Sequence, residues 1–296
     1  MPGARPPTKR HGQGEPMGQG RLGIIGCPVL EDEIVYLLTS DRDLKDVFVV
    51  EDDNSEKLIQ KLRAKGVPIV PIKEGDIAGL PNGAGRSVLV WMKSMGLHED
   101  PGELGREVSR TVMALDGHCS VILLFYGLCG NAFKDMDRLL EPVRTPVVIL
   151  RDEEGRIVDD CIAVPLGGTD GYLRLLKRYA GVFYMTPAWA DNWRTLINKM
   201  EITRGTEMGD LDMLRMIFEM TGYNRVLMID TGLGDREILR TRTHEFAQEF
   251  GFRELELEPG FVSTAVSDAA YQRCIELMEH GKKGRGEEGP KSVPSS

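Results

Sequence analysis

The sequence predicts an α/β protein of the Rossmann-like type, with a mainly parallel sheet and helices on both faces. Short apolar runs alternate with amphipathic segments along most of the chain. Several of these runs are apolar at nearly every position, as strands buried on both faces of a parallel sheet are. Strand and helix signals also follow one another in regular alternation, which is typical of parallel strands joined by crossover helices.

The first half of the chain contains six strand signals and four helix signals. Asn54 or Ser55 is a suitable N-cap for the second of the helices. The predicted strands are 21–26, 47–52, 67–72, 87–92, 120–126 and 146–151, and the predicted helices are 29–38, 55–65, 103–115 and 133–140.

The second half continues in the same way. One helix begins at Pro187, because proline is well tolerated in the first turn. The other predicted helices are 172–179, 208–220, 235–250 and 268–280, and the predicted strands are 181–185, 225–230 and 252–258.

Two similar Rossmann-like halves that meet near residues 150–165 explain this order, and a single larger sheet is the alternative. We expect an N-terminal half over 21–150 and a C-terminal α/β half over 151–280. The two ends, 1–20 and 281–296, are rich in glycine, proline and charge and lack apolar periodicity. We expect both ends to be disordered tails.

Composition excludes several classes of protein. Of the 296 residues, 41% are hydrophobic and 28% charged, and the net charge of −9 argues against binding to nucleic acid or to an anionic membrane surface. No apolar run reaches the ~18 residues of a membrane span. The first twenty residues lack the apolar stretch of a secretory signal. We therefore expect a cytoplasmic protein without a nucleic-acid or membrane partner.

Three of the five cysteines stand at or near the ends of predicted strands. Cys27 follows the strand 21–26, Cys129 follows 120–126, and Cys161 comes ten residues after 146–151. The carboxyl ends of parallel strands gather on one edge of a sheet, where ligands bind, so the three thiols can converge there. Gly127 and Gly130 allow the backbone to turn beside Cys129.

Convergent thiolates suit Zn²⁺ or an iron–sulfur cluster, because both prefer sulfur ligands. Cys27, Cys129 and Cys161 are the candidate metal ligands. The fourth ligand is Asp159 or Asp160, or the position is left to water or substrate. The sequence has no Cys-x-x-Cys pair, so the alternative is that these cysteines are simply buried or loop residues.

Other segments have both a functional and an ordinary structural interpretation. The glycine-rich turns 230–234 and 167–170 each precede a helix and are candidate anion sites, or else tight turns, the second with Asp170 as N-cap. Trp189 is a candidate pocket wall for a flat ligand, or else a core residue. Glu31 and Glu33 lie close enough to Cys27 in sequence to accept a proton, although acids at a helix start are commonly solvated.

Four segments resemble a known family. GCPVLEDEI, VILLFYGLCGN, DDCIAVPLGG and GVFYMTPAW, in this order, resemble the domain of unknown function 1638 family over roughly residues 21–260. The resemblance implies a cysteine at each of the positions Cys27, Cys129 and Cys161. The family's His-Asp-Cys is Asp159-Asp160-Cys161 here, and its Pro-Gly-Trp is Pro187-Ala188-Trp189, so the chain resembles a divergent member. Such proteins are often encoded near corrinoid-dependent methyltransferases, which implies a link to one-carbon metabolism.

These observations leave more than one function open. The first hypothesis is a metal-binding protein, with Zn²⁺ or an iron–sulfur cluster, that serves corrinoid-dependent methyl transfer as a methyltransferase or as its accessory. The second is a non-catalytic module that binds a small ligand or a corrinoid at Gly127, Gly130, Asn131, Thr169 and Trp189. The third is a thiol-redox regulatory module. The expected partner is a small-molecule ligand or a corrinoid protein, and self-association as a homo-oligomer is left open.

Overall fold

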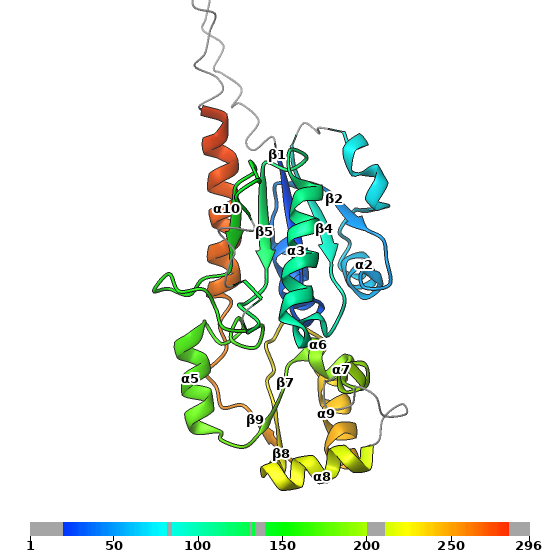
Figure 1. Ribbon diagram of the computed structural model, residues 1–296, viewed down its shortest axis with the longest axis vertical. Coiled ribbons are helices and arrows are strands. Elements are labelled where there is room, and N and C mark those ends of the chain that lie inside the picture. Colours follow the sequence, from blue (N-terminus) through cyan, green and yellow to red (C-terminus); the bar gives the residue numbers. More distant parts are fainter. Residues whose placement is uncertain (1–19, 82–84, 131, 134–139, 200–210, 284–296) are drawn as a thin grey trace, which may run out of the picture.

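The structure, a computed structural model, describes residues 20–81, 85–130, 132–133, 140–199 and 211–283. Two sheets make up its two lobes, a larger one in the upper part and a smaller one in the lower part of the view (Figure 1). All strand pairs within the named strands of the described residues run parallel. The predicted Rossmann-like parallel α/β class is therefore confirmed.

The larger sheet has six strands in the order β3-β2-β4-β1-β5-β6. Its central strands are the apolar runs of the sequence, and β4 and β5 are buried at every position because helices cover both faces. The strands are β1 (Gly20–Gly26), β2 (Leu44–Val50), β3 (Ile69–Ile72), β4 (Arg86–Met92), β5 (Val121–Phe125) and β6 (Val147–Ile149).

The register of the three central strands brings their carboxyl ends to one level. Gly26, the last residue of β1, pairs with Met92 on one side and with Phe125 on the other. Cys27, Lys93 and Tyr126 therefore leave the sheet at the same edge, which is where the candidate site lies.

Helices cover the larger sheet on both faces. In Figure 1, α3 lies in front of the sheet, and it contacts β1. On the opposite face α10 contacts β1, β5, β6 and α1, and α1 contacts α2. These helices are α1 (Glu31–Ser40), α2 (Glu56–Ala64), α3 (Pro101–Leu115) and α10 (Ala265–Lys283), with short 3-10 helices η1 (Pro28–Leu30), η2 (Glu74–Gly79) and η3 (Leu97–Glu99).

The smaller sheet has the order β7-β8-β9 and its own aromatic core. Phe246 lies at the centre of this core, with ring centroids 4.7 Å from Phe183 and 5.4 Å from Trp193. The elements are α5 (Thr169–Arg178), β7 (Phe183–Met185), α6 (Pro187–Asp191), α7 (Trp193–Lys199), α8 (Leu211–Thr221), β8 (Arg225–Met228), α9 (Arg236–Phe250) and β9 (Arg253–Glu256).

The chain enters and leaves this second lobe at neighbouring points. Leu166 and Ser263 form a parallel bridge, and the Ser263 N–H donates to the Pro165 carbonyl at 2.9 Å. Beyond Ser263 the chain returns as α10, whose buried side chains belong to the core of the larger sheet. The first lobe thus consists of residues 20–166 and 263–283, and the second lobe of 167–262. The packing of α10 differs in this respect from the predicted boundary, which assigned 151–280 to one half.

Some predicted segments lie wholly or partly outside the described residues. These are 134–139 of the helix expected over 133–140, residues 208–210 of the helix expected over 208–220, and most of the tails 1–20 and 281–296. Gly20 begins β1, however, and α10 continues to Lys283.

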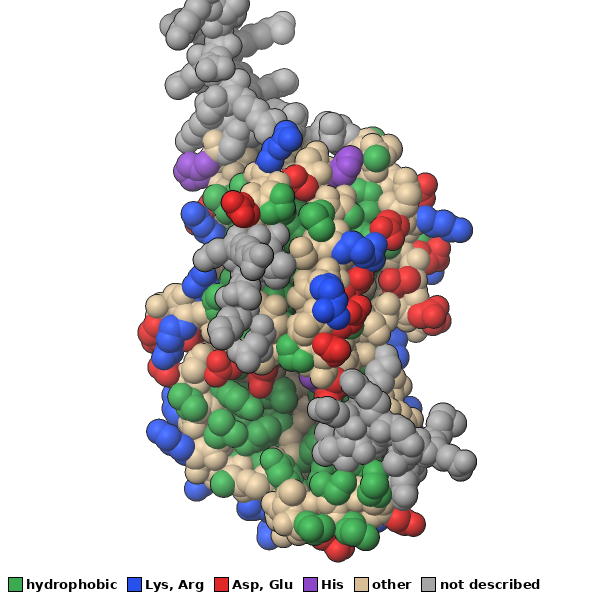
Figure 2. Space-filling model, viewed as in Figure 1, with side chains coloured by type: hydrophobic (Ala, Val, Ile, Leu, Met, Phe, Trp, Pro, Cys, Tyr) green, Lys and Arg blue, Asp and Glu red, His purple; other side chains and the backbone are tan. Residues whose placement is uncertain are grey.

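The two lobes differ in their surfaces. On the face shown in Figure 2, basic and acidic side chains alternate over the first lobe, whereas hydrophobic side chains gather over the second. Among the described residues with large exposed hydrophobic side chains, most belong to the second lobe: Leu173, Leu176, Met216, Met220, Tyr223, Ile238 and Val262. No helix in the described part of the chain combines the length and apolar character needed to cross a bilayer.

The buried strand β5 gives a direct test of this core. Leu123 is fully buried at its centre, so Leu123→Ala leaves a cavity and lowers the free energy of unfolding by about 2–5 kcal/mol. Met113 on α3 is 51% exposed, and Met113→Ala changes the same quantity by less than about 0.5 kcal/mol. Urea unfolding of the two variants makes the comparison, and equal effects would contradict the assignment of β5 to the core.

Candidate thiol site

Cys27, Cys129 and Cys161 lie together at the carboxyl edge of the larger sheet. Cys27 comes directly after β1 and caps η1, and its N–H donates to the carbonyl of Phe125 at 3.4 Å. Cys129 lies in the loop after β5, with a left-handed backbone (φ 45°) that is uncommon outside glycine. Cys161 comes from the connection between the lobes, and it is as deeply buried as Cys27.

The sulfur of Cys161 is the centre of this group, which we call the thiol cluster (Cys27, Cys129 and Cys161). Side-chain hydrogen bonds join Cys161 to both Cys27 and Cys129, and the backbone N–H of Gly127 donates to Cys161 as well. The buried Cys161 sulfur thus lies close to the side chains of Cys27 and Cys129 and to the backbone of Gly127. This arrangement stabilises negative charge on Cys161.

The pKa values of the three cysteines shift in opposite directions. Hydrogen bonds from Cys129 and Cys27 lower the pKa of Cys161 well below the usual value of a thiol. Donation to Cys161, together with burial, raises the pKa values of Cys27 and Cys129. Burial also raises the pKa of Tyr126, and the three nearby sulfurs raise it further.

A close backbone contact brings the loop of Cys129 against the segment of Cys161. A Cβ atom on Gly127 would lie 2.7 Å from both Cα and C of Asp160, so only glycine fits there. The N–H groups of Leu128 and Cys129 donate to the carbonyls of Val158 and Asp159 at 2.7 and 2.9 Å. The contact and the two hydrogen bonds together fix how far Cys129 lies from Cys161.

The carboxylate beside the sulfurs belongs to Asp160, whereas the Asp159 side chain is exposed. Asp160 Oδ1 accepts from the N–H groups of Ile162 and Ala163 at 2.8 and 2.9 Å, and its side chain also hydrogen bonds to Tyr172. Burial raises the pKa of Asp160. Asp160 thus holds the turn that carries Cys161 and connects it to α5 of the second lobe.

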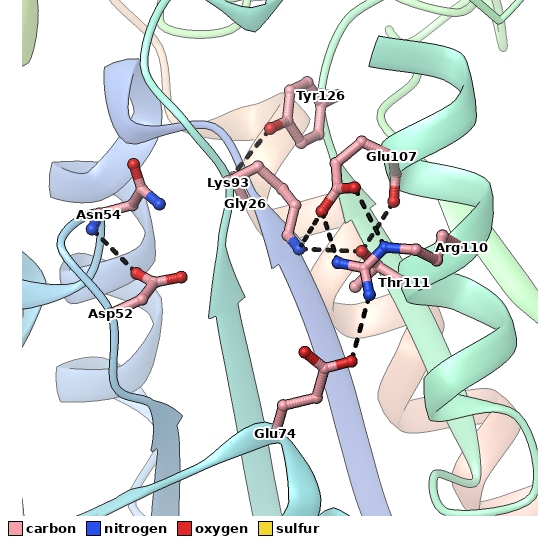
Figure 3. A network of polar contacts seen from close by, with 9 residues as sticks. All are labelled: Gly26, Asp52, Asn54, Glu74, Lys93, Glu107, Arg110, Thr111 and Tyr126. Carbon is pink, nitrogen blue, oxygen red and sulfur yellow. Dashed lines mark hydrogen bonds and ion pairs between the residues drawn. The ribbon is translucent and has the colours of Figure 1, made fainter. Parts of the chain in front are cut away.

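A polar network supports the backbone just before Cys27. The carbonyl of Gly26 accepts hydrogen bonds from the Lys93 N–H at 3.0 Å and from the Tyr126 hydroxyl at 3.3 Å. Figure 3 shows the Lys93 side chain turning toward α3, where its ammonium donates to Glu107 at 3.0 Å and to Thr111 at 2.9 Å. The buried Lys93 thereby joins α3 to the strand end that positions Cys27.

Three acidic residues at the start of α1 are buried next to the cluster. Lys61 Nζ lies 2.7 Å from Glu31 and 2.7 Å from Asp32. Within the described residues no hydrogen bond or ion pair joins Glu33 to a lysine, and burial raises its pKa from 4.5 to about 8, with Asp32 contributing. Glu33 therefore keeps its proton at neutral pH, in the region where the sequence suggested a proton acceptor.

The predicted ligand residues are spread over both lobes. Gly127 and Gly130 lie on the loop of Cys129, and Asn131 lies outside the described residues. Thr169 is the first residue of α5, and its buried hydroxyl has no hydrogen-bond partner in the described part of the chain. Trp189, on α6, packs 4.7 Å from the Phe183 ring and touches the cores of both lobes. The structure gives Trp189 a packing role at the junction of the lobes.

The two glycine-rich turns are stabilised internally. Asp230 accepts from the Gly232 N–H at 3.0 Å and pairs with Arg236 at 3.0 Å. In the other turn, Gly168 is the N-cap of α5, so the prediction of Asp170 as N-cap was wrong. A φ of 101° at Gly168 requires glycine at that position, and Asp170 pairs with Arg156 at 3.1 Å instead.

The remaining two cysteines lie apart from the cluster. Cys119 and Cys274 are buried, and burial raises the pKa of each thiol to about 12. They behave as small hydrophobic residues of the core. Both serve as matched controls for substitutions in the thiol cluster.

The donor set of the cluster suits a soft metal ion, but the sulfurs are not arranged as metal ligands. Within the described ranges, no group of three or more His, Cys, Asp or Glu side chains is positioned to hold a metal ion. The hydrogen bonds between the sulfurs require Cys27 and Cys129 to keep their protons. A shared ion would require both protons to leave and the sulfurs to shift.

Tyr126 and Tyr172 belong to the site but were not singled out from the sequence. Tyr126 ends the apolar run 121–126, so the sequence indicates that it is buried, but not that its hydroxyl contacts the Gly26 carbonyl. Tyr172 reaches Asp160 from the other lobe, and no local pattern marks such a contact.

The fold and the site define a parallel α/β protein with three cysteine thiols at the carboxyl edge of its larger sheet. The chain belongs to the family described as protein of unknown function (DUF1638), whose model matches residues 91–263, more than half of the chain. Cys129 and Cys161 lie within the matched region and Cys27 precedes it. A comparison with curated proteins gives no match.

The glycine contact yields a test of the cluster's geometry. Gly127→Ala places a Cβ against the backbone of Asp160, so the two segments separate and Cys161 loses the Gly127 N–H. We expect faster alkylation of Cys161 and a loss of about 1–3 kcal/mol in the free energy of unfolding. Gly75, which has open space around it, is the control, and Gly75→Ala leaves both quantities unchanged. Equal behaviour of the two variants would refute the contact.

Glu33 predicts a pH dependence of stability. Its pKa is near 4.5 in the unfolded chain and about 8 in the folded protein, so its contribution is fully present below pH 4.5. As pH rises toward 8, the unfolded state alone releases the proton, and wild-type stability falls by up to about 1.4 kcal/mol per pH unit. Glu33→Gln cannot ionise, so its stability relative to wild type rises across this range. Urea unfolding from pH 5 to 8 checks this, and a constant difference would contradict it.

Proposed function

We propose that the thiol cluster binds a soft metal ion, with Cys27, Cys129 and Cys161 as ligands. The observation that carries the proposal is that Cys27 and Cys129 lie beside the buried Cys161 at one edge of the larger sheet. Three neighbouring sulfurs are the donor set that Zn²⁺ and iron–sulfur clusters prefer, and Zn²⁺ is our first choice. An iron–sulfur cluster is the second.

The fourth coordination position is the functional one in this proposal. The oxygens of Asp160 are occupied by the backbone of its own turn and by Tyr172. Asp159 remains the protein candidate for the fourth ligand, but its exposed side chain favours leaving the position to a substrate. A thiolate-bound zinc ion, when present, lowers the pKa of an incoming thiol and keeps it nucleophilic.

The protein's own groups would hold and position such a substrate. Gly127, through its N–H, and Asp160, through its turn, fix Cys161, and the protonated Glu33 beside the cluster is available to exchange a proton. The resemblance to proteins encoded near corrinoid methyltransferases adds methyl transfer in one-carbon metabolism. We propose a cytoplasmic methyltransferase or methyltransferase accessory, with a small thiol or a corrinoid protein as partner.

Metal analysis of protein purified without air tests the proposal. We expect one zinc or iron site per chain, lost in Cys27→Ser, Cys129→Ser and Cys161→Ser and retained in Cys119→Ala and Cys274→Ala. Binding should release about two protons, because Cys27 and Cys129 are protonated beforehand, and affinity should fall as pH falls. Titration with Co²⁺, followed by its thiolate absorption, gives the same readout by spectroscopy. A protein that takes up no metal under these conditions refutes the proposal.

A further inference from the structure

A second property follows from the contacts of the thiol cluster. Cys161 lies beside both Cys27 and Cys129, and the Cys129 N–H donates to the carbonyl of Asp159, two residues before Cys161, so we take Cys161 as one member of a disulfide in this cluster. The two candidates for its partner differ in exposure. Cys129 is partly exposed, whereas Cys27 and Cys161 are 6% and 8% exposed. A reagent from solution therefore meets Cys129 first.

The backbone also favours Cys129 as the partner. Its segment is hydrogen bonded directly to the segment of Cys161, through Leu128 to Val158 and Cys129 to Asp159. Cys27, by contrast, is fixed between β1 and η1, where its carbonyl accepts from Leu30 at 2.9 Å. The left-handed backbone of Cys129, followed by Gly130 at φ 71°, is a conformation that surrounding contacts must maintain. A covalent bond to the adjoining segment adds one more such contact.

We propose that Cys129 and Cys161 form a site of reversible oxidation by hydroperoxides. The Cys129 sulfur attacks one peroxide oxygen as its proton passes to the departing oxygen. The O–O bond breaks, and Cys129 becomes a sulfenic acid while water or an alcohol leaves. The Cys161 sulfur then attacks the Cys129 sulfur, the S–O bond breaks, and a second water leaves. The two sulfurs lose two electrons in total, and the peroxide gains them. A dithiol reductant reverses the change.

Oxidation would leave Cys27 as the one free thiol of the cluster. The inference does not rest on metal binding, because it depends only on the contact between two reduced sulfurs. Oxidation would also regulate the proposed metal binding, because a disulfide makes two of the three sulfur ligands unable to bind the metal. The state of the thiols and the uptake of metal are therefore measured separately.

Peptide mapping tests the proposal on the full chain. Cys119 and Cys129 share the tryptic peptide 111–134, so the work uses a Cys119→Ala background, treated with chelator and fully reduced. After one equivalent of hydrogen peroxide, denaturation and alkylation, we expect peptide 111–134 to be cross-linked to 157–174. Peptide 22–42, with Cys27, is expected to remain alkylated. Dithiothreitol should restore all three alkylated peptides.

Variants separate the roles of the sulfurs. Cys27→Ala should leave the cross-link yield within about 2-fold of the parent, and Cys161→Ala should abolish it while Cys129 gains oxygen as sulfinic acid. A cross-link that contains peptide 22–42, oxygen addition without a cross-link, or no reaction would each overturn the proposal. The peptide map of the parent protein tests the disulfide proposal even if Cys161→Ala does not fold.

The two proposals can fail separately. A protein that forms the cross-link but takes up no metal would refute only the metal proposal. A protein that takes up metal but forms no cross-link would refute only the disulfide proposal.

Discussion

The contact between Gly127 and the backbone of Asp160 is the constraint on which the thiol cluster depends. β5 fixes one side of this contact, because it is buried at every position and ends at Phe125, level with the end of β1. The segment that joins the lobes forms the other side. A residue with a Cβ would separate them, and the Cys161 sulfur would lose the Gly127 N–H. The arrangement of the thiol cluster therefore requires a residue without a Cβ at position 127.

Electrostatics at this edge of the sheet follows from burial. Removal from water disfavours charge and raises the pKa values of Glu33 and Asp160. For Cys27 and Cys129, donation to Cys161 is the first cause of the raised pKa and burial the second. Cys161 is the exception: its pKa is lowered, because Cys129 and Cys27 donate to its sulfur. Lys61 compensates Glu31 and Asp32 at one end of the region, and Lys93 is held by Glu107 at the other. Negative charge at this edge is therefore favoured only at groups with a donor beside them, such as Glu31 and Asp32 next to Lys61.

The fold could be predicted largely from local pattern, and the site only in part. Apolar runs such as 121–126 marked the strands, and strand ends marked where Cys27 and Cys129 lie, because period and burial are local properties. The return of α10 to the first lobe could not be predicted, because the apolar face of a helix does not show which of two sheets it packs against. The capping role of Asp160, and the exposure of Asp159 next to it, depend on how one turn meets Gly127 and Tyr172. Contacts of this kind leave no trace in spacing or composition.

The bridge between Leu166 and Ser263 makes the second lobe an insertion in the first. The two ends of the second lobe leave the first lobe side by side, and Lys57 of α2 also pairs with Asp191 of α6 across the two lobes. The six-stranded sheet and α10 share one hydrophobic core, which includes Cys27 and Cys161, and Cys129 packs against it. The inserted lobe reaches this core through Tyr172, which hydrogen bonds to Asp160 beside Cys161, so a shift of the inserted lobe would act directly on the turn that carries Cys161.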